Sequence, residues 1–341
     1  MSAPGSSRLS FRRLLPPIGL SSRYRRALLQ SLVGVALLGI FISQLDLAEI
    51  AALTRQATIA PLVVALLLYA LDFYLRAVRF WMLLEAVSDR SVPLRAVPGP
   101  FITSFGISDL LPLRAGDIFR LAWFQRNMGL PISSVLGAML IERFYDLSAL
   151  LLLGGFLVAA HVGAEAGLIV ALGLPLGFMI LTRLAGMMAG HAPVPSATSP
   201  DRGLRGRLVD GVWATLRSFT ILRSSRRQGL FLGLSLLCWL LEAGLFLGAW
   251  ISLGGRMEQW AAAMAAFTAS TLGTLVPGLP GHFGTFELFG LAMFRLGGVD
   301  RNFGAAVLML AHMMLWAPTA LYAMVWLALT RRGGRSRQET E

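Results

Sequence analysis

Residues 110–120 read LLPLRAGDIFR, and residues 275–287 read LVPGLPGHFGTFE. In both stretches proline and glycine interrupt apolar sequence that extends to either side, so a single continuous helix cannot run through them. Backbone without helical hydrogen bonds is tolerated at membrane depth only where it is buried in protein or lines a wet cavity. A pair of interrupted segments, one in each half of a chain, is the best sequence pointer to a transporter's binding site. We therefore expect a central cavity shaped by Pro112, Gly116, Pro277, Gly278, Pro280, Gly281 and Gly284.

The composition is that of an integral membrane protein. Of the 341 residues 56% are hydrophobic and only 14% are charged, and the mean hydropathy is +0.68, far above that of a soluble domain. The single cysteine, Cys238, excludes an internal disulfide and a cysteine-rich metal site. The sequence contains no P-loop, no HExxH motif and no plausible constellation for a nucleophile, so we expect no metal and no cofactor.

The hydrophobic pattern predicts an all-α, polytopic transmembrane bundle with six full spans and two re-entrant helical hairpins. We expect a disordered N-terminus over residues 1–23, one transmembrane domain over 24–330 and a basic tail over 331–341. The expected full spans cover residues 27–44, 59–84, 133–160, 167–189, 229–253 and 303–330, and the interrupted segments cover 97–126 and 258–296. Residues 190–203 are expected to form a hydrophilic loop, and residues 204–222 an amphipathic helix in the membrane interface.

The distribution of arginine orients this bundle. The chain has 30 basic residues and no lysine, and a cytoplasmic N-terminus places most of the arginines on the cytoplasmic side. Both termini are then cytoplasmic, the first hairpin opens from the cytoplasm, and the second opens from the opposite side. The orientation of the spans in the membrane therefore accounts for the excess of arginine. The positive charge need not serve nucleic-acid binding, which we do not expect. A weak alignment of residues 129–143 with residues 298–312 supports two inverted repeats at about 59–160 and 229–330.

Many charged residues fall within the expected spans, where each costs about 2.5–3.5 kcal/mol on insertion scales. Those beside the first break and on its neighbouring helices are Arg76, Arg79, Arg114, Asp117, Arg120, Glu142, Arg143 and Asp146. One interpretation is mutual salt bridging that holds helices together. The other is an anion site, in which planar guanidinium groups and free backbone N–H groups bind a phosphate, with Arg143 held deeper in the path by Glu142 or Asp146.

A second set of polar residues is a candidate for a gate or a proton relay. It consists of Asp72, Glu242, His282, Glu287 and His312, some near the second break and some within spans. The alternative is that the histidines are packed polar residues, because no third or fourth ligand has the spacing of a metal site. We expect neutralisation of Arg114 or Arg120 to weaken cargo binding more than Glu287→Gln does.

Four motifs together resemble a known family. They are RAVRFW at 76–81, LPLRAGDIFR at 111–120, IERFYD at 141–146 and PGLPGHFGTFE at 277–287. They are similar to the flippase-like family named after the transmembrane region of lysylphosphatidylglycerol synthase, over roughly residues 27–330. Asp117 stands where that family commonly has glutamate, and Phe80 separates Arg79 from Trp81, which are expected to be adjacent. The resemblance implies a lipid-translocating membrane domain.

The leading hypothesis is a lipid flippase or transporter of the bacterial inner membrane that works by alternating access. Its cargo is expected to have an anionic head group, as in a phospholipid or a polyprenyl-phosphate-linked sugar. Some relatives carry a soluble aminoacyl-transferring domain, but only eleven residues follow Thr330, so we expect no aminoacylation by this chain alone. Two alternatives are a membrane glycosyltransferase that uses Asp46 or Glu49, and a non-catalytic partner of envelope-lipid synthesis enzymes. The oligomeric state is not predicted.

Overall fold

The computed structural model describes residues 32–88, 90–161, 163–190, 204–276 and 278–338, and every element assigned there is a helix. After an N-terminal helix at Leu32–Ile42, the elements are α2 (Leu47–Arg55), α3 (Ile59–Val87), η2 (Leu94–Ala96), α4 (Pro98–Leu110), α5 (Ala115–Met128), α6 (Ile132–His161), α7 (Ala164–Gly190), α8 (Leu204–Ser218), η3 (Phe219–Arg223), α9 (Ser225–Ser252), η4 (Met257–Gln259), α10 (Trp260–Gly273), η5 (Pro280–His282), α11 (Thr285–Leu296) and α12 (Arg301–Gln338). The predictions for residues 1–23, 191–203 and Pro277 lie outside the described residues.

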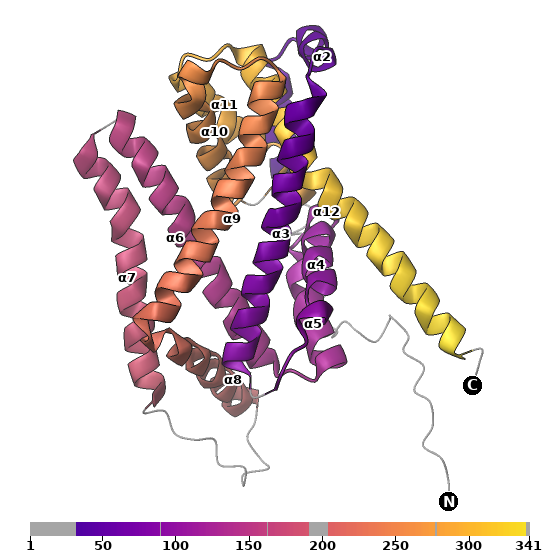
Figure 1. Cartoon of the computed structure of the whole chain (residues 1–341), viewed down its shortest axis with the longest axis vertical. Helices are drawn as coiled ribbons and strands as arrows, with labels where there is room; N and C mark the ends of the chain where they lie inside the picture. Colours follow the sequence, from indigo (N-terminus) through magenta and orange to yellow (C-terminus); the bar gives the residue numbers. More distant parts are fainter. Residues whose placement is uncertain (1–31, 89, 162, 191–203, 277, 339–341) are drawn as a thin grey trace, which may run out of the picture.

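Two long helices, α3 and α9, run side by side through the middle of the molecule (Figure 1). Helices α6 and α7 form an adjacent pair along one side, and α8 lies across the end where that pair begins and ends. Close packing between α3 and α9 depends on Gly248, because a Cβ atom there would lie 2.6 Å from the Cβ of Ala65. Side chains that α3 and α9 direct toward each other and toward α6 are therefore held on a rigid frame.

Each interrupted segment folds as two helices in contact with each other, α4 with α5 and α10 with α11. The first pair lies toward the α8 end of the molecule and the second toward the α2 end (Figure 1). Helix α5 approaches α4 closely because residue 116 is glycine; a Cβ atom there would lie 1.6 Å from the carbonyl oxygen of Ser104. Gly284 begins α11 with a φ of 90°, a conformation that favours glycine, and its Cβ position faces the backbone of the N-terminal helix at Leu38.

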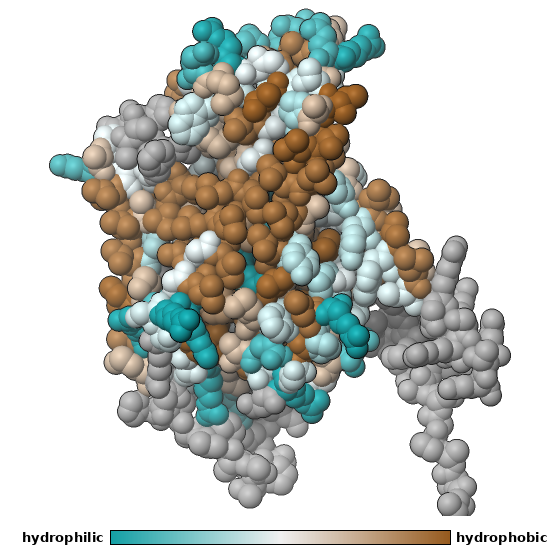
Figure 2. All heavy atoms as spheres, in the orientation of Figure 1, coloured by the Kyte–Doolittle hydropathy of each residue, from teal (hydrophilic) through white to brown (hydrophobic). Residues whose placement is uncertain are grey.

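Within the described residues, four helices are long and apolar enough to cross a membrane, judged by length and composition: α3, α7, α9 and α12. The N-terminal helix and α2 form a fifth candidate, bent by 80°. Helix α6 has the length of a span but carries three charged residues near its middle. Figure 2 shows a belt of hydrophobic residues across the middle of one face, with hydrophilic residues toward both ends. The protein is therefore an all-helical, multi-pass membrane protein.

The structure corrects one expectation between the first two expected spans and extends the last helix. Residues 45–58 connect the expected spans 27–44 and 59–84 and are not all loop. Nine of them form α2, because the Asp46 side chain accepts hydrogen bonds from the first backbone N–H groups of this helix. Helix α12 continues beyond residue 330 to Gln338 and so includes the first residues of the basic tail expected over 331–341.

Candidate functional site

The two helix breaks meet each other. A pocket of about 280 Å³ is lined by Leu111, Leu113 and Arg114 from the first break and by residues 278–282 from the second. Three non-glycine residues in these breaks have left-handed backbone conformations: Leu113, Arg114 and His282, with φ values of 62°, 51° and 63°. Such conformations are uncommon outside glycine and are found at sites where the surrounding structure enforces them. The breaks are therefore specific turns that face one another.

A larger cavity of about 420 Å³ adjoins this pocket and shares Arg114 and His282 with it. Helices α3, α4, α5, α6, α9, α10 and α12 all contribute to its wall. Ten of the residues that the sequence singled out line it: Arg76, Arg114, Asp117, Arg120, Arg143, Asp146, Glu242, Gly281, His282 and His312. Asp72, Arg79, Glu142 and Glu287 lie one layer behind, in contact with residues of that wall.

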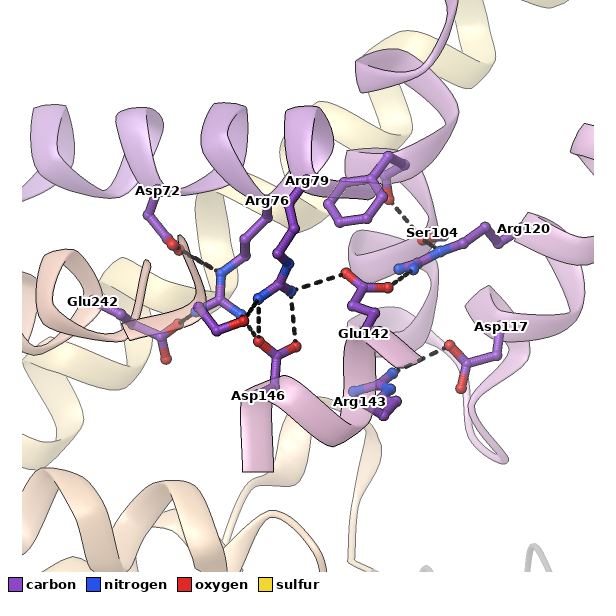
Figure 3. Close-up of polar contacts among 12 residues, drawn as sticks. Asp72, Arg76, Arg79, Ser104, Asp117, Arg120, Glu142, Arg143, Asp146 and Glu242 are labelled. Atoms are coloured by element: carbon purple, nitrogen blue, oxygen red, sulfur yellow. Dashed lines mark hydrogen bonds and ion pairs between the residues drawn. The ribbon is translucent and has the colours of Figure 1, made fainter. Parts of the chain in front are cut away.

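Arg76 of α3 joins three helices through carboxylates. Its Nε donates to both oxygens of Asp72, at 2.8 and 2.9 Å, and its Nη2 donates to Glu242 Oε2 at 2.7 Å (Figure 3). Its Nη1 lies 3.9 Å from Asp146 Oδ1 of α6, and its guanidinium carbon lies 4.8 Å from the centre of the Trp239 ring. The guanidinium is buried, so this network takes the place of water as its surroundings.

Arg79, one helical turn further along α3, is fully buried and forms a two-pronged ion pair. Its Nη1 and Nη2 donate to the two oxygens of Asp146 at 2.7 and 3.1 Å (Figure 3). It also donates to the Ser235 hydroxyl of α9 and, at 3.4 Å, to Glu142 of α6. Arg79 therefore fastens α3 to α6 and α9 at one point.

Arg120 of α5 is the third buried guanidinium. It donates from Nη1 to Glu142 Oε2 at 2.7 Å and from Nε to the Ser104 hydroxyl at 2.9 Å. The guanidinium carbon lies 4.4–5.0 Å from the ring centres of Phe80, Phe101 and Phe105. The buried guanidiniums of Arg76, Arg79 and Arg120 are thus already paired with carboxylates, which favours salt bridging as their resting role.

Arg143 and Arg114 have different surroundings. We expected Glu142 or Asp146 to hold Arg143, but its Nη2 instead lies 3.2 Å from Asp117 Oδ1 of α5, and its side chain is 48% exposed. The Arg114 side chain is exposed, and it has no hydrogen bond or ion pair among the residues that the structure describes. These two guanidiniums are the ones that remain accessible from the cavity.

Because the Arg143–Asp117 pair is half exposed, it should add little to stability. We expect Arg143→Gln to change the free energy of unfolding by no more than about 1 kcal/mol, the usual range for exposed ion pairs. Thermal unfolding of the purified protein in detergent measures this change. A destabilisation as large as that of Arg120→Gln would mean that Arg143 is buried against a further partner.

The second break is fixed by a different pair. His312 Nδ1 of α12 lies 2.5 Å from Glu287 Oε1 of α11, and its Nε2 lies 2.7 Å from the Gly281 carbonyl oxygen in the break. The other Glu287 oxygen accepts from the backbone N–H of Gly284 at 2.8 Å. Rings of Phe283 and Phe286 lie with their centres 4.5 Å from the His312 ring. These contacts tie α12, α11 and the break into one unit.

The comparison with protein families agrees with this architecture. The family model for the lysylphosphatidylglycerol synthase TM region matches residues 27–322. The chain belongs to this family. A search of curated proteins finds no match. The family is a membrane-lipid family, and its matched range contains both helix breaks and every buried ion pair described above.

The sequence placed Asp109 beside the first break but did not identify its partner on another helix. Asp109, at the end of α4, accepts a hydrogen bond from the Thr319 hydroxyl of α12 at 2.7 Å, and its carbonyl oxygen accepts from Trp316 Nε1 at 3.2 Å. The available signal was an acidic residue at expected membrane depth, which requires a partner. No cluster of His, Cys, Asp and Glu suited to a metal ion occurs within the described residues.

Proposed function

We propose that the protein is a flippase or transporter that moves a lipid with an anionic head group across the membrane. The observation that carries this proposal is Arg114. Its exposed guanidinium, which has no partner among the described residues, projects from a strained turn that lines both the pocket at the two breaks and the larger cavity. A phosphate is the natural ligand for such a group, because guanidinium offers two parallel N–H donors to its oxygens.

The wall around Arg114 suits a lipid head group. Arg143 adds a second accessible guanidinium, and His282 lines the same space. The cavity volume of about 420 Å³ lies within the range of small-molecule sites. Aromatic rings of Phe73, Trp239 and Trp316 supply apolar surface beside these polar groups. Membership in a membrane-lipid family supports a lipid as the cargo, either a phospholipid or a polyprenyl-phosphate-linked sugar.

We further propose the topology that such transport needs. It comprises six full spans, including α6, and two re-entrant hairpins, α4–α5 and α10–α11, in an inverted repeat with both termini cytoplasmic in the bacterial inner membrane. The placement of the two hairpins at opposite ends, with their breaks in contact, supports this topology (Figure 1). Movement of one hairpin and its neighbours against the other would expose the cavity alternately to the two sides.

Transport by the purified protein tests the proposal. In liposomes we expect the protein to move head-group-labelled phosphatidylglycerol faster than empty vesicles do. Arg114→Gln should lower the rate about tenfold or more, since a hydrogen bond to a charged group contributes about 1.5–3 kcal/mol. The matched control is Arg256→Gln, because the Arg256 side chain is 75% exposed in a pair far from the cavity wall. The proposal would be refuted if the protein moved no anionic lipid faster than empty vesicles do and if Arg114→Gln had no effect on the function of the protein in cells.

The glycosyltransferase alternative is less well supported. Asp46 accepts the hydrogen bonds that begin α2, and Glu49 accepts one from Asn302 at 2.5 Å, so both acids have structural partners. A role as a non-catalytic partner of envelope-lipid enzymes is distinguished by the same liposome assay, which contains this protein alone. We propose that the chain is a transporter and not an enzyme.

A further inference from the structure

The ion pairs around the three buried guanidiniums at the cavity wall do not balance in charge. They contain four carboxylates (Asp72, Glu142, Asp146 and Glu242) and three guanidiniums (Arg76, Arg79 and Arg120), which we call the charge cluster. Fully ionised, this cluster has a net charge of −1, and none of its side chains is more than 15% exposed. An uncompensated buried charge is costly, and a carboxylate in that position takes up a proton instead. The remaining charged residues of the wall include an opposite pair, Arg143 with Asp117.

The hydrogen bonds show which carboxylate can take the proton. Both oxygens of Asp72 accept from Arg76, both oxygens of Asp146 accept from Arg79, and Glu142 accepts from Arg79 on one oxygen and from Arg120 on the other. Glu242 differs, because Arg76 contacts only its Oε2. Its Oε1 has no hydrogen-bond partner among the described residues, and the side chain is 15% exposed at the cavity wall. A proton on Oε1 breaks no existing hydrogen bond.

The same contact links this proton to the cargo. Arg76 Nη2 donates to Glu242 at 2.7 Å, and both residues line the cavity. A neutral Glu242 no longer holds Nη2 by charge, so this donor becomes available to an anion in the cavity while Nε stays on Asp72. An ionised Glu242, in contrast, occupies the donor and repels a phosphate.

We propose that Glu242 is the proton-binding site of the transport cycle, and that its protonation frees Arg76 to bind the lipid phosphate in the cavity that Arg114 also lines. This inference rests on the proposed function and adds its coupling ion: one proton enters the site with each anionic head group. The energy source is then a proton gradient.

The other groups around Glu242 are compatible with this role. Those that interact with it are Tyr69, Asp72 and Arg76 of α3 and Asp146 of α6, and His312 of α12 lines the same cavity. His312 is already engaged by Glu287 of α11, and Tyr69 donates its hydroxyl hydrogen to the Leu315 carbonyl oxygen at 2.7 Å. Helix α10 contributes Thr271, Thr274 and no titratable group to the described cavity wall. The rival proton site is Asp109, a wall carboxylate whose printed side-chain partner is the Thr319 hydroxyl and which has no guanidinium partner among the described residues.

Binding of dihexanoyl phosphatidylglycerol to the purified full-length protein tests the proposal by calorimetry from about pH 5 to about pH 9. Because the protonated form binds the lipid, the Kd of the wild-type protein should rise with pH, by about tenfold per unit once Glu242 is ionised. Glu242→Gln, which mimics the neutral acid, should bind at every pH with the affinity that the wild-type protein has at low pH. Glu258→Gln, on an exposed glutamate, should keep the wild-type slope, as should Asp109→Asn.

The outcomes separate this inference from the proposed function. The assignment to Glu242 is overturned if the Kd of Glu242→Gln rises with pH as steeply as that of the wild-type protein. It is also overturned if the Kd of Asp109→Asn does not change with pH. Direct measurement of proton uptake by the wild-type protein in weak buffer keeps the test valid if Glu242→Gln does not fold; no uptake on lipid addition also overturns it. Absence of lipid binding by the wild-type protein at every pH would instead refute the proposed function.

Discussion

Replacement of Arg79 by alanine should destabilise the protein by about 3–5 kcal/mol, the usual cost of removing one partner from a buried ion pair. The change strands Asp146, which loses both of its short contacts and keeps only Arg76 at 3.9 Å. It also removes the donor that Ser235 of α9 accepts from. We expect the variant to give little monodisperse protein, and fluorescence-detected size exclusion after heating measures the loss.

Two further variants identify the cause of that loss. Arg256→Ala removes an exposed arginine and should leave the profile unchanged, which controls for the loss of positive charge. Arg79→Gln combined with Asp146→Asn should be more stable than Arg79→Gln alone, because the second change removes the stranded carboxylate. If Asp146→Asn instead destabilises the Arg79→Gln variant as much as it destabilises the wild-type protein, the two effects are additive. The Arg79–Asp146 pair is then not the source of the stability.

The elements of the fold follow from local sequence signals. Residues 59–84 were predicted as a helix, and α3 covers Ile59–Val87, because this predominantly apolar stretch contains no proline or glycine after its first turn to end a helix. The breaks were located by their prolines and glycines, because these residues interrupt a helix. Helix α2 was missed because it is short and lies in a segment that hydropathy alone marks as a connection; the Asp46 cap was the available signal.

The pairing of charges did not follow from the sequence. Arg76 and Glu242 are 166 residues apart, and Arg79 and Asp146 are 67 apart, so only the packing of α3, α6 and α9 selects them. Arg143 was assigned to its neighbours on α6. However, consecutive residues on a helix point about 100° apart, so Glu142 faces Arg79 and Arg120 while Arg143 reaches Asp117 on α5. Intervals along one helix identify possible pairs, and tertiary packing decides among them.

Gly116→Leu should abolish lipid transport even if the protein still inserts into the membrane. The Cβ atom alone would lie 1.6 Å from the Ser104 carbonyl oxygen and 2.5 Å from the Ser108 hydroxyl oxygen. The contacted atom at 1.6 Å belongs to the backbone, which cannot rotate away as a side chain can, so α5 must move away from α4. Overpacking typically costs about 1–3 kcal/mol, and we expect this substitution to cost about 3 kcal/mol or more. That movement displaces Arg120 from Ser104 and Arg114 from the cavity wall, so both the buried pair and the proposed lipid ligand are affected.

The matched control for this glycine is Gly177→Ala on α7, where an added Cβ atom meets nothing within 4 Å. Gly177→Ala should be neutral or stabilising by about 0.5–1 kcal/mol, because alanine favours a helix over glycine. Gly116→Ala, with the smallest possible side chain, should already reduce transport in liposomes and lower the unfolding temperature. If Gly116→Ala and Gly177→Ala both transport lipid at the wild-type rate, close contact between α4 and α5 is not required for the site. In that case α4 and α5 could separate without loss of transport, and Arg114 would not need a rigid turn between these helices to bind its anion.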